Sequence, residues 1–184
     1  MALKRYIIDG YGQLELNQVA FRRDGRVEAQ CALDEEDFAD IKAENGMLLA
    51  IDRVNRVVKL PEAGKDFPIA LNYTSEHMYD DRHNALKDFA LERGTFYPRL
   101  GYLSVGELFT SNCLAYDDTA FDDDEAVDTA LEAFKTTAVF GQPCANGAIQ
   151  LTTTKPASGI GLKVVEVTTM PDGQRGIKFQ VISA

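Results

Sequence analysis

Apolar and polar positions alternate on both sides of a Pro-Asp-Gly sequence near the C-terminus, over residues 162–183. Proline pre-sets the backbone angle φ of a type I turn and glycine accepts the left-handed position after it, so residues 171–173 suit a three-residue hairpin loop. The pattern therefore predicts a β-hairpin with one apolar face and one charged face. Counting outward from the loop gives three cross-strand pairs: Val167 with Ile177, Val165 with Phe179, and Glu166 with Lys178.

A second hairpin is predicted near the N-terminus, over residues 17–33. A two-residue Asp-Gly turn at 24–25 would place apolar residues opposite polar ones. A three-residue loop over residues 23–25 keeps apolar residues opposite one another, so we expect this register. It pairs Phe21 with Val27 and Val19 with Ala29.

Further short apolar runs, each bounded by Gly, Pro, Asn or Asp, are typical of strands. They cover residues 4–8, 47–52, 57–60, 69–73, 101–105, 108–116 and 148–154. The expected fold is mainly β, a β-barrel or β-sandwich of hairpins with one or two short α-helices. We expect a single β-rich domain over residues 1–184, with an N-terminal hairpin subregion at 1–60 and the main β-rich region at 61–184.

Two segments depart from the strand pattern and predict helices. The second half of residues 74–91 places apolar side chains at helical spacing, at Ala85, Leu86, Phe89 and Ala90. A helix near 122–135 is better defined, because an acidic start precedes an apolar face. That face consists of Val127, Ala130, Leu131 and Phe134.

The net charge indicates which partners to expect, and the cysteine content indicates the compartment in which the chain folds. The chain has 184 residues and a formal net charge of −10; residues 116–128 carry seven carboxylates and no Lys or Arg, which leaves −10 − (−7) = −3 for the rest. This balance disfavours nucleic acid and anionic membrane surfaces as partners. Three widely spaced cysteines indicate folding in a reducing cytoplasm, and neither a signal peptide nor a membrane span is expected.

The acidic run at 116–128 has three interpretations. A calcium loop of the EF-hand type needs a glycine at its sixth position and oxygen ligands at alternating positions, and this run contains no glycine. Acidic residues in the first turn of a helix oppose the macrodipole, and Thr119 or Asp122 could cap free amides. We therefore expect a helix start with a solvated face, and contact with a basic patch on a partner remains the alternative use of the surplus carboxylates.

Other candidates for chemistry also have structural interpretations. His77 and His83 are six residues apart, with Asp80 and Asp81 between them, which places the two imidazoles on different faces of a helix. This group would be the first place to seek an active site. Cys113 lies in an apolar run and is expected to be a buried small side chain.

The basic sequence at 21–26 contains Arg22, Arg23 and Arg26 on a turn, where the arginines could bind a partner's carboxylates, although a solvated turn is favoured. No residue is assigned as catalytic, cofactor-binding or metal-ligating, and no enzyme activity or cofactor is expected.

Several stretches together resemble small virion structural proteins encoded in the head gene clusters of tailed bacteriophages and prophages. They are "GYLSVGELFTSNCLAYDD" at 101–118, the acidic-started helix, "TTAVFGQPCANGAIQL" at 136–151 and "TTMPDGQRGIKFQVISA" at 168–184. The similarity spans about residues 68–184 and lies in the order and character of segments. The proteins it resembles are associated with capsid decoration and head stabilisation.

This resemblance implies a non-enzymatic, β-rich protein that binds the outer surface of an assembled capsid. It would bridge neighbouring major capsid subunits and form a homo-oligomer. It would need neither nucleic acid nor a membrane, and it would be found on the virion after folding in the bacterial host cytoplasm. A tail or head-tail connector component is the alternative, and a small-molecule-binding protein or enzyme is a further one.

Overall fold

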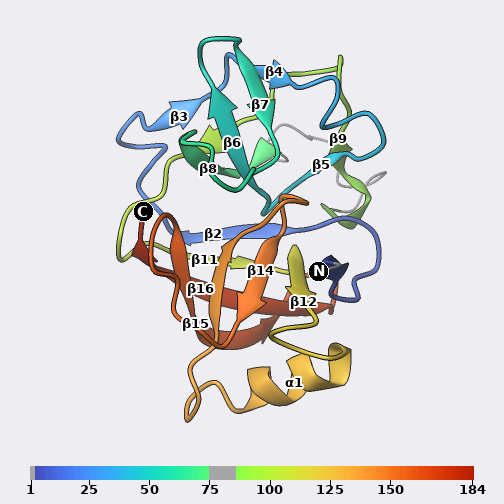
Figure 1. Cartoon of the computed structure of the whole chain (residues 1–184), viewed down its shortest axis with the longest axis vertical. Helices are drawn as coiled ribbons and strands as arrows, with labels where there is room; N and C mark the ends of the chain where they lie inside the picture. The colour runs from blue at the N-terminus through green and yellow to red at the C-terminus, as the bar shows by residue number, and fades with distance from the viewer. Residues whose placement is uncertain (1–2, 75–85) are drawn as a thin grey trace.

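The computed structural model describes residues 3–74 and 86–184, and within them the fold is mainly β, as expected (Figure 1). The largest sheet has eight strands in the order β1 (Leu3–Arg5), β12 (Leu114–Asp117), β14 (Ile149–Thr152), β13 (Phe140–Pro143), β15 (Gly161–Thr169), β16 (Arg175–Ser183), β11 (Leu108–Ser111) and β2 (Leu14–Gln18). A six-stranded sheet has the order β3 (Val27–Glu28), β10 (Leu100–Gly101), β8 (Ile69–Asn72), β6 (Leu48–Asp52), β7 (Val57–Lys59) and β4 (Ala32–Leu33). A small third sheet pairs β5 (Ala43–Glu44) with β9 (Ala90–Leu91).

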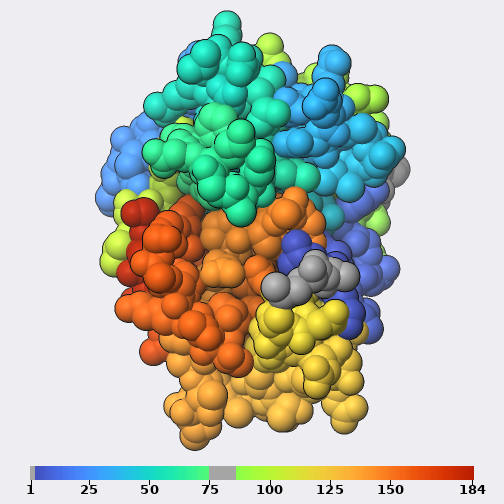
Figure 2. Space-filling model, in the orientation of Figure 1, coloured from blue at the N-terminus to red at the C-terminus, as the bar shows by residue number. Residues whose placement is uncertain are grey.

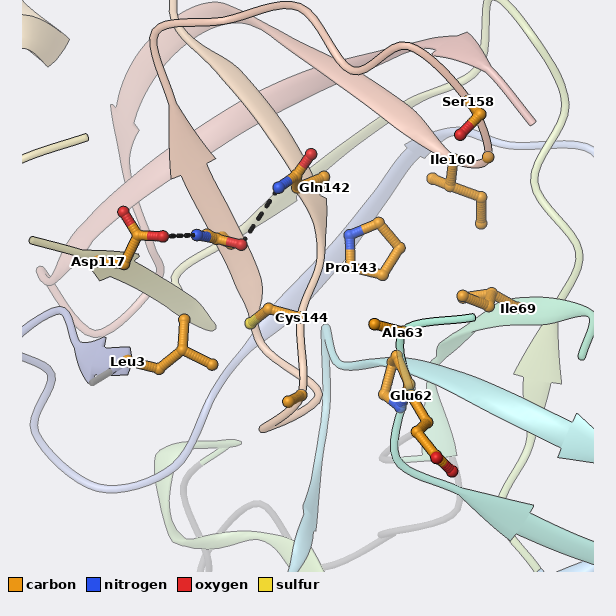
Figure 3. Close-up of a pocket in the computed structure, with 14 residues that line it drawn as sticks. Leu3, Glu62, Ala63, Ile69, Asp117, Gln142, Pro143, Cys144, Ser158 and Ile160 are labelled. Carbon is orange, nitrogen blue, oxygen red and sulfur yellow. Dashed lines mark hydrogen bonds between the residues drawn. The ribbon is translucent and has the colours of Figure 1, made fainter. Parts of the chain in front are cut away.

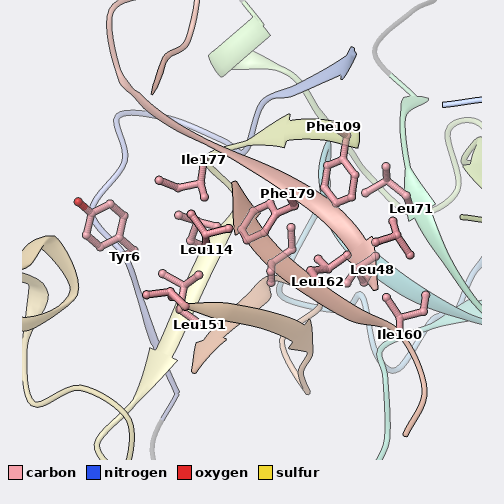
Figure 4. Close-up of a cluster of buried hydrophobic side chains, with 14 of the residues drawn as sticks. Tyr6, Leu48, Leu71, Phe109, Leu114, Leu151, Ile160, Leu162, Ile177 and Phe179 are labelled. Carbon is pink, nitrogen blue, oxygen red and sulfur yellow. The ribbon is translucent and has the colours of Figure 1, made fainter. Parts of the chain in front are cut away.

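The two large sheets and helix α1 (Asp124–Glu132) follow one another along the long axis of the molecule. In Figure 1 the six-stranded sheet lies at one end, the curved eight-stranded sheet lies in the middle, and helix α1 closes the other end. One buried cluster includes Phe109, Leu162 and Phe179 of the eight-stranded sheet together with Leu48 and Leu71 of the six-stranded sheet (Figure 4). A second cluster lies where the outer face of β12 meets the six-stranded sheet, with Ala115 packed in the same cluster as Ile51. Apolar burial therefore joins the two large sheets.

The C-terminal hairpin forms around the predicted loop. Met170 N–H donates to the carbonyl of Gln174 at 2.7 Å. The pairs Val167 with Ile177 and Glu166 with Lys178 are confirmed. The outermost expected pair is wrong, because a register shift between Val164 and Glu166 places Val164 opposite Phe179. This β-bulge adds one residue on β15 and keeps Val164, rather than Val165, in the buried position.

The N-terminal hairpin pairing is wrong. The turn itself is present, because Gly25 has φ +70° and Arg26 N–H donates to the carbonyl of Phe21 at 2.8 Å. Its two arms then separate: β2 pairs with β11 in the eight-stranded sheet and β3 pairs with β10 in the six-stranded sheet.

The nearly buried carboxylate of Glu107 binds the turn at the point where the two arms separate. Its Oε1 accepts from Ala20 N–H at 2.8 Å and from the Arg26 guanidinium at 2.9 Å. Its Oε2 accepts from Ser104 N–H at 2.8 Å. A local sequence pattern cannot indicate an acceptor that lies some 80 residues away along the chain.

Helix α1 occupies the position predicted near 122–135, and it buries Val127 and Leu131. Its N-cap is Asp123 rather than Thr119 or Asp122, because the Asp123 carboxylate accepts from Ala126 N–H at 2.8 Å. Thr119 belongs to a separate turn.

The remaining expectations have mixed outcomes. The runs at 47–52, 57–60, 69–73 and 148–154 each contain a strand. The runs at 4–8 and 101–105 only overlap one, at Lys4 and Arg5 of β1 and at Gly101 of β10. The run at 108–116 contains two strands, β11 and β12, interrupted at Asn112 and Cys113.

The helix expected in the second half of 74–91 is not an α-helix in its described part. That part is a short 3-10 turn, η2 (Leu86–Asp88), followed by β9, which contains Ala90. Among the described residues, no helix is long and apolar enough to cross a membrane.

Candidate interaction surface

The acidic run uses most of its carboxylates within the chain. Asp117 accepts from Thr119 N–H, from the Thr119 hydroxyl and from Ala120 N–H, and these hydrogen bonds, that of the Thr119 hydroxyl foremost, hold the pKa of Asp117 below its ordinary value. Asp118 forms an ion pair with Lys4 at 2.6 Å. Asp123 caps the helix, so the run is the entrance of α1 and a set of local contacts.

Asp128 ties the helix to the eight-stranded sheet. Its carboxylate accepts from the hydroxyl of Tyr6 and from the guanidinium of Arg175 at the start of β16. Burial, together with the hydrogen bond to Asp128, raises the pKa of Tyr6 to about 12. This cluster positions α1 against the end of the core.

Metal and imidazole chemistry has little support in the part of the chain that the structure describes. Across residues 3–74 and 86–184, no group of three or more His, Cys, Asp and Glu side chains is arranged to hold a metal ion. The candidates His77, Asp80, Asp81 and His83 lie outside the described residues.

Cys113 is fully buried, as expected, and it lies in a polar junction. Its Sγ is 3.4 Å from the guanidinium of Arg5. Arg5 donates in turn to Glu44 at 2.7 Å, and Glu44 also accepts from Gly12 N–H at 2.6 Å. Burial raises the pKa of Cys113 to about 12, which keeps the thiol protonated and unsuited to nucleophilic attack. The junction joins β1 to β5.

The basic turn at 21–26 is largely used inside the chain. Arg26 donates to Glu107 and to the carbonyl of Tyr102, which fixes the link between the two large sheets. Arg23 pairs with its own neighbour, Asp24, at 2.9 Å. Arg26 therefore has a structural role rather than the partner-binding role that the sequence allowed.

A cavity of about 480 Å³ lies at the seam between the two large sheets (Figures 2 and 3). Part of its polar lining is a chain of hydrogen bonds: Gln142 Nε2 donates to Gln150 Oε1 at 3.2 Å, and Gln150 Nε2 donates to Asp117 Oδ2 at 2.6 Å. Glu62 and Ser158 also line the cavity. Apolar residues from both sheets, Ile69 and Ile160 among them, complete the wall. Gln142, Gln150 and Asp117 bond to one another, so this part of the wall offers a ligand fewer free donors and acceptors.

Among the described residues, two adjacent aromatic side chains are exposed on a loop over residues 92–99, here called the aromatic loop. Phe96 is 75% exposed and Tyr97 is 57% exposed, and the two are adjacent. Two hydrogen bonds fix the loop. Within it, the Thr95 hydroxyl donates to the carbonyl of Glu92 at 2.6 Å, and the Arg93 side chain donates to the carbonyl of Glu35 at 2.9 Å. A braced loop of this kind presents two large aromatic rings at little cost in conformational entropy.

The sequence contained a signal for this loop that the strand and helix patterns do not use. In "ERGTFYPR" a glycine turn precedes two consecutive aromatics and a proline. Consecutive side chains point to opposite faces of a strand, so both rings cannot face the same core. Strand β10 begins directly after Arg99, at Leu100.

No protein-family model, curated protein or solved structure matches this chain.

Proposed function

We propose that this chain is a non-enzymatic virion structural protein that binds the outer surface of a phage capsid and stabilises it by bridging major capsid subunits. The observation that carries the proposal is the aromatic loop, which lies within the stretch 68–184 that resembles virion proteins. Aromatic and arginine side chains are enriched at protein interfaces and supply much of their binding energy. Exposed Phe96 and Tyr97 therefore favour a protein partner.

The remaining properties are compatible with this role. A net charge of −10 does not oppose docking on the outside of a shell whose nucleic acid is enclosed. Many copies on one shell would gain avidity without a tight single contact. The proposed partner is the major capsid protein, and the chain is proposed to form a homo-oligomer on the virion surface.

Co-sedimentation with capsids tests the proposal. The purified full chain is added to capsids assembled without it and, separately, to tail tubes of the same phage. We expect it to pellet with the capsids and to leave the tubes bare. Binding to tubes alone would favour the tail or connector alternative, and binding to neither would refute the proposal.

A matched pair of variants identifies the surface. Replacing both aromatics, Phe96→Ser with Tyr97→Ser, should weaken capsid binding at least about tenfold, which corresponds to the loss of a small set of dominant contacts. Val54→Ser is the control, because Val54 is 91% exposed on a different turn, between β6 and β7. Equal binding by all three proteins would show that the aromatic loop does not contact the capsid.

A further inference from the structure

Beside the aromatic loop lies a cavity of about 520 Å³, here called the Arg99 pocket. Phe96, Tyr97 and Arg99 of the loop line it. The other described lining residues are Ala29, Thr74, Phe89 and Leu91. A volume of this size accommodates one or two side chains of a partner, and its lining is mostly apolar.

Arg99 brings a positive charge to this apolar setting. Its backbone is fixed, because Arg99 N–H donates to the Thr74 hydroxyl at 3.0 Å and its carbonyl accepts from Tyr73 N–H at 2.9 Å. The side chain is half-buried. Within residues 3–74 and 86–184, its guanidinium has no hydrogen bond or ion pair, unlike those of Arg26 and Arg93.

Because the guanidinium of Arg99 has no partner among the described residues, its charge indicates the chemistry of what the pocket receives. The guanidinium of an arginine beside apolar walls binds best to a carboxylate, which can pair with its planar fork through two parallel hydrogen bonds. The apolar walls favour an apolar side chain next to that carboxylate. Charge and shape therefore both point to a peptide segment in which an acidic residue adjoins an apolar one.

We propose that the Arg99 pocket binds an extended segment of a neighbouring protein in which a carboxylate lies beside an apolar side chain. The segment belongs to the major capsid protein, an assignment that rests on the proposed function. The carboxylate pairs with Arg99, and the apolar side chain packs between Phe96 and Leu91. The aromatic rings form the rim that excludes water from the ion pair.

A peptide titration tests the pocket independently of any capsid. The probe is a capped nine-residue peptide that alternates leucine and glutamate, and its counterpart has glutamine in place of every glutamate. Binding to the full chain is followed by NMR chemical shifts. We expect the glutamate peptide to shift signals of Phe96, Leu91 and Arg99, and the glutamine peptide to bind about tenfold more weakly.

Substitutions assign the effect to one side chain. Arg99→Gln should remove the preference for glutamate, and Arg99→Lys should retain part of it, because lysine keeps the charge but not the fork. Arg23→Gln is the control, because Arg23 is 81% exposed on the turn at 21–26 and does not line the Arg99 pocket, and it should change nothing. Equal affinity of wild type and Arg99→Gln for the glutamate peptide would overturn the inference, as would shifts confined to other surfaces.

Capsid binding separates this inference from the proposed function. Peptide binding through Arg99 without capsid binding would leave the pocket assigned and refute the capsid role. Capsid binding that Arg99→Gln leaves unchanged would retain the capsid role and refute the pocket as its contact. If Arg99→Gln instead converts an oligomer to a monomer, the occupant is a second copy of this chain, and a capsid segment is contradicted.

Discussion

The carboxylate of Glu107 gives the sharpest test of how the two large sheets are joined. It accepts three hydrogen bonds, two from the backbone N–H groups of Ala20 and Ser104 and one from the guanidinium of Arg26. The Glu107 side chain is only 9% exposed and that of Arg26 is 31% exposed, so the ion pair is mostly shielded from water. Glu107→Gln removes the charge and replaces one acceptor oxygen with a donor.

The expected loss follows from these contacts. At least one N–H donor would face an NH₂ group, and Arg26 would lose its carboxylate, for a combined cost of about 2–4 kcal/mol in the free energy of unfolding. The control is Glu166→Gln, which breaks the exposed pair with Lys178 and should cost less than about 1 kcal/mol.

Urea unfolding followed by circular dichroism measures both variants. A loss for Glu107→Gln below about 1 kcal/mol, or one equal to that of Glu166→Gln, would refute the role of Glu107 as the acceptor that holds the two sheets together.

Three further predictions concern the helix cap, the buried thiols and the acidic run. Asp123→Ala should destabilise the chain by about 1 kcal/mol through loss of the N-cap, whereas the exposed Asp122→Ala should be nearly neutral by the same urea assay; equal effects would contradict the assignment of the cap. Burial raises the pKa of Cys113 to about 12 and that of Cys144 to about 11, so above about pH 9 the unfolded chain releases thiol protons that the folded chain retains. Stability should therefore fall as pH rises, by up to about 1.4 kcal/mol per pH unit for each thiol, and Cys113→Ala should flatten this fall in unfolding experiments at a series of pH values; an unchanged slope would contradict its burial as a thiol. Millimolar calcium should leave the melting temperature unchanged, and a clear rise in calorimetry would show that the acidic run binds the ion.

Local chemistry was enough to predict some elements of the fold. The hairpin loop at 171–173 and the apolar face of α1 depend on residues close together in sequence, so turn residues and periodicity determine them. The bulge at Val165 and the separation of the N-terminal arms depend on distant partners. The two arms pair with β11 and β10, which are distant in sequence, so a local pattern favoured a hairpin that does not form.

The candidate interaction surface also combines features that the sequence predicts with features that depend on the folded chain. The acidic run could be interpreted from sequence as a helix entrance, although its cap is Asp123 rather than Thr119 or Asp122. The exposure of Phe96 and the unpaired guanidinium of Arg99 in the described part of the chain depend on how the loop is braced by Glu35 and Thr74. Neither feature has a periodic signature, so a motif search does not find it.

Electron cryomicroscopy of capsids mixed with the purified chain tests the central proposal most directly. We predict additional density on the outer surface, over the contacts between neighbouring major capsid subunits, with the aromatic loop of residues 92–99 directed at the shell. Bare capsids at saturating protein, or density found only at the tail or connector, would contradict the proposal.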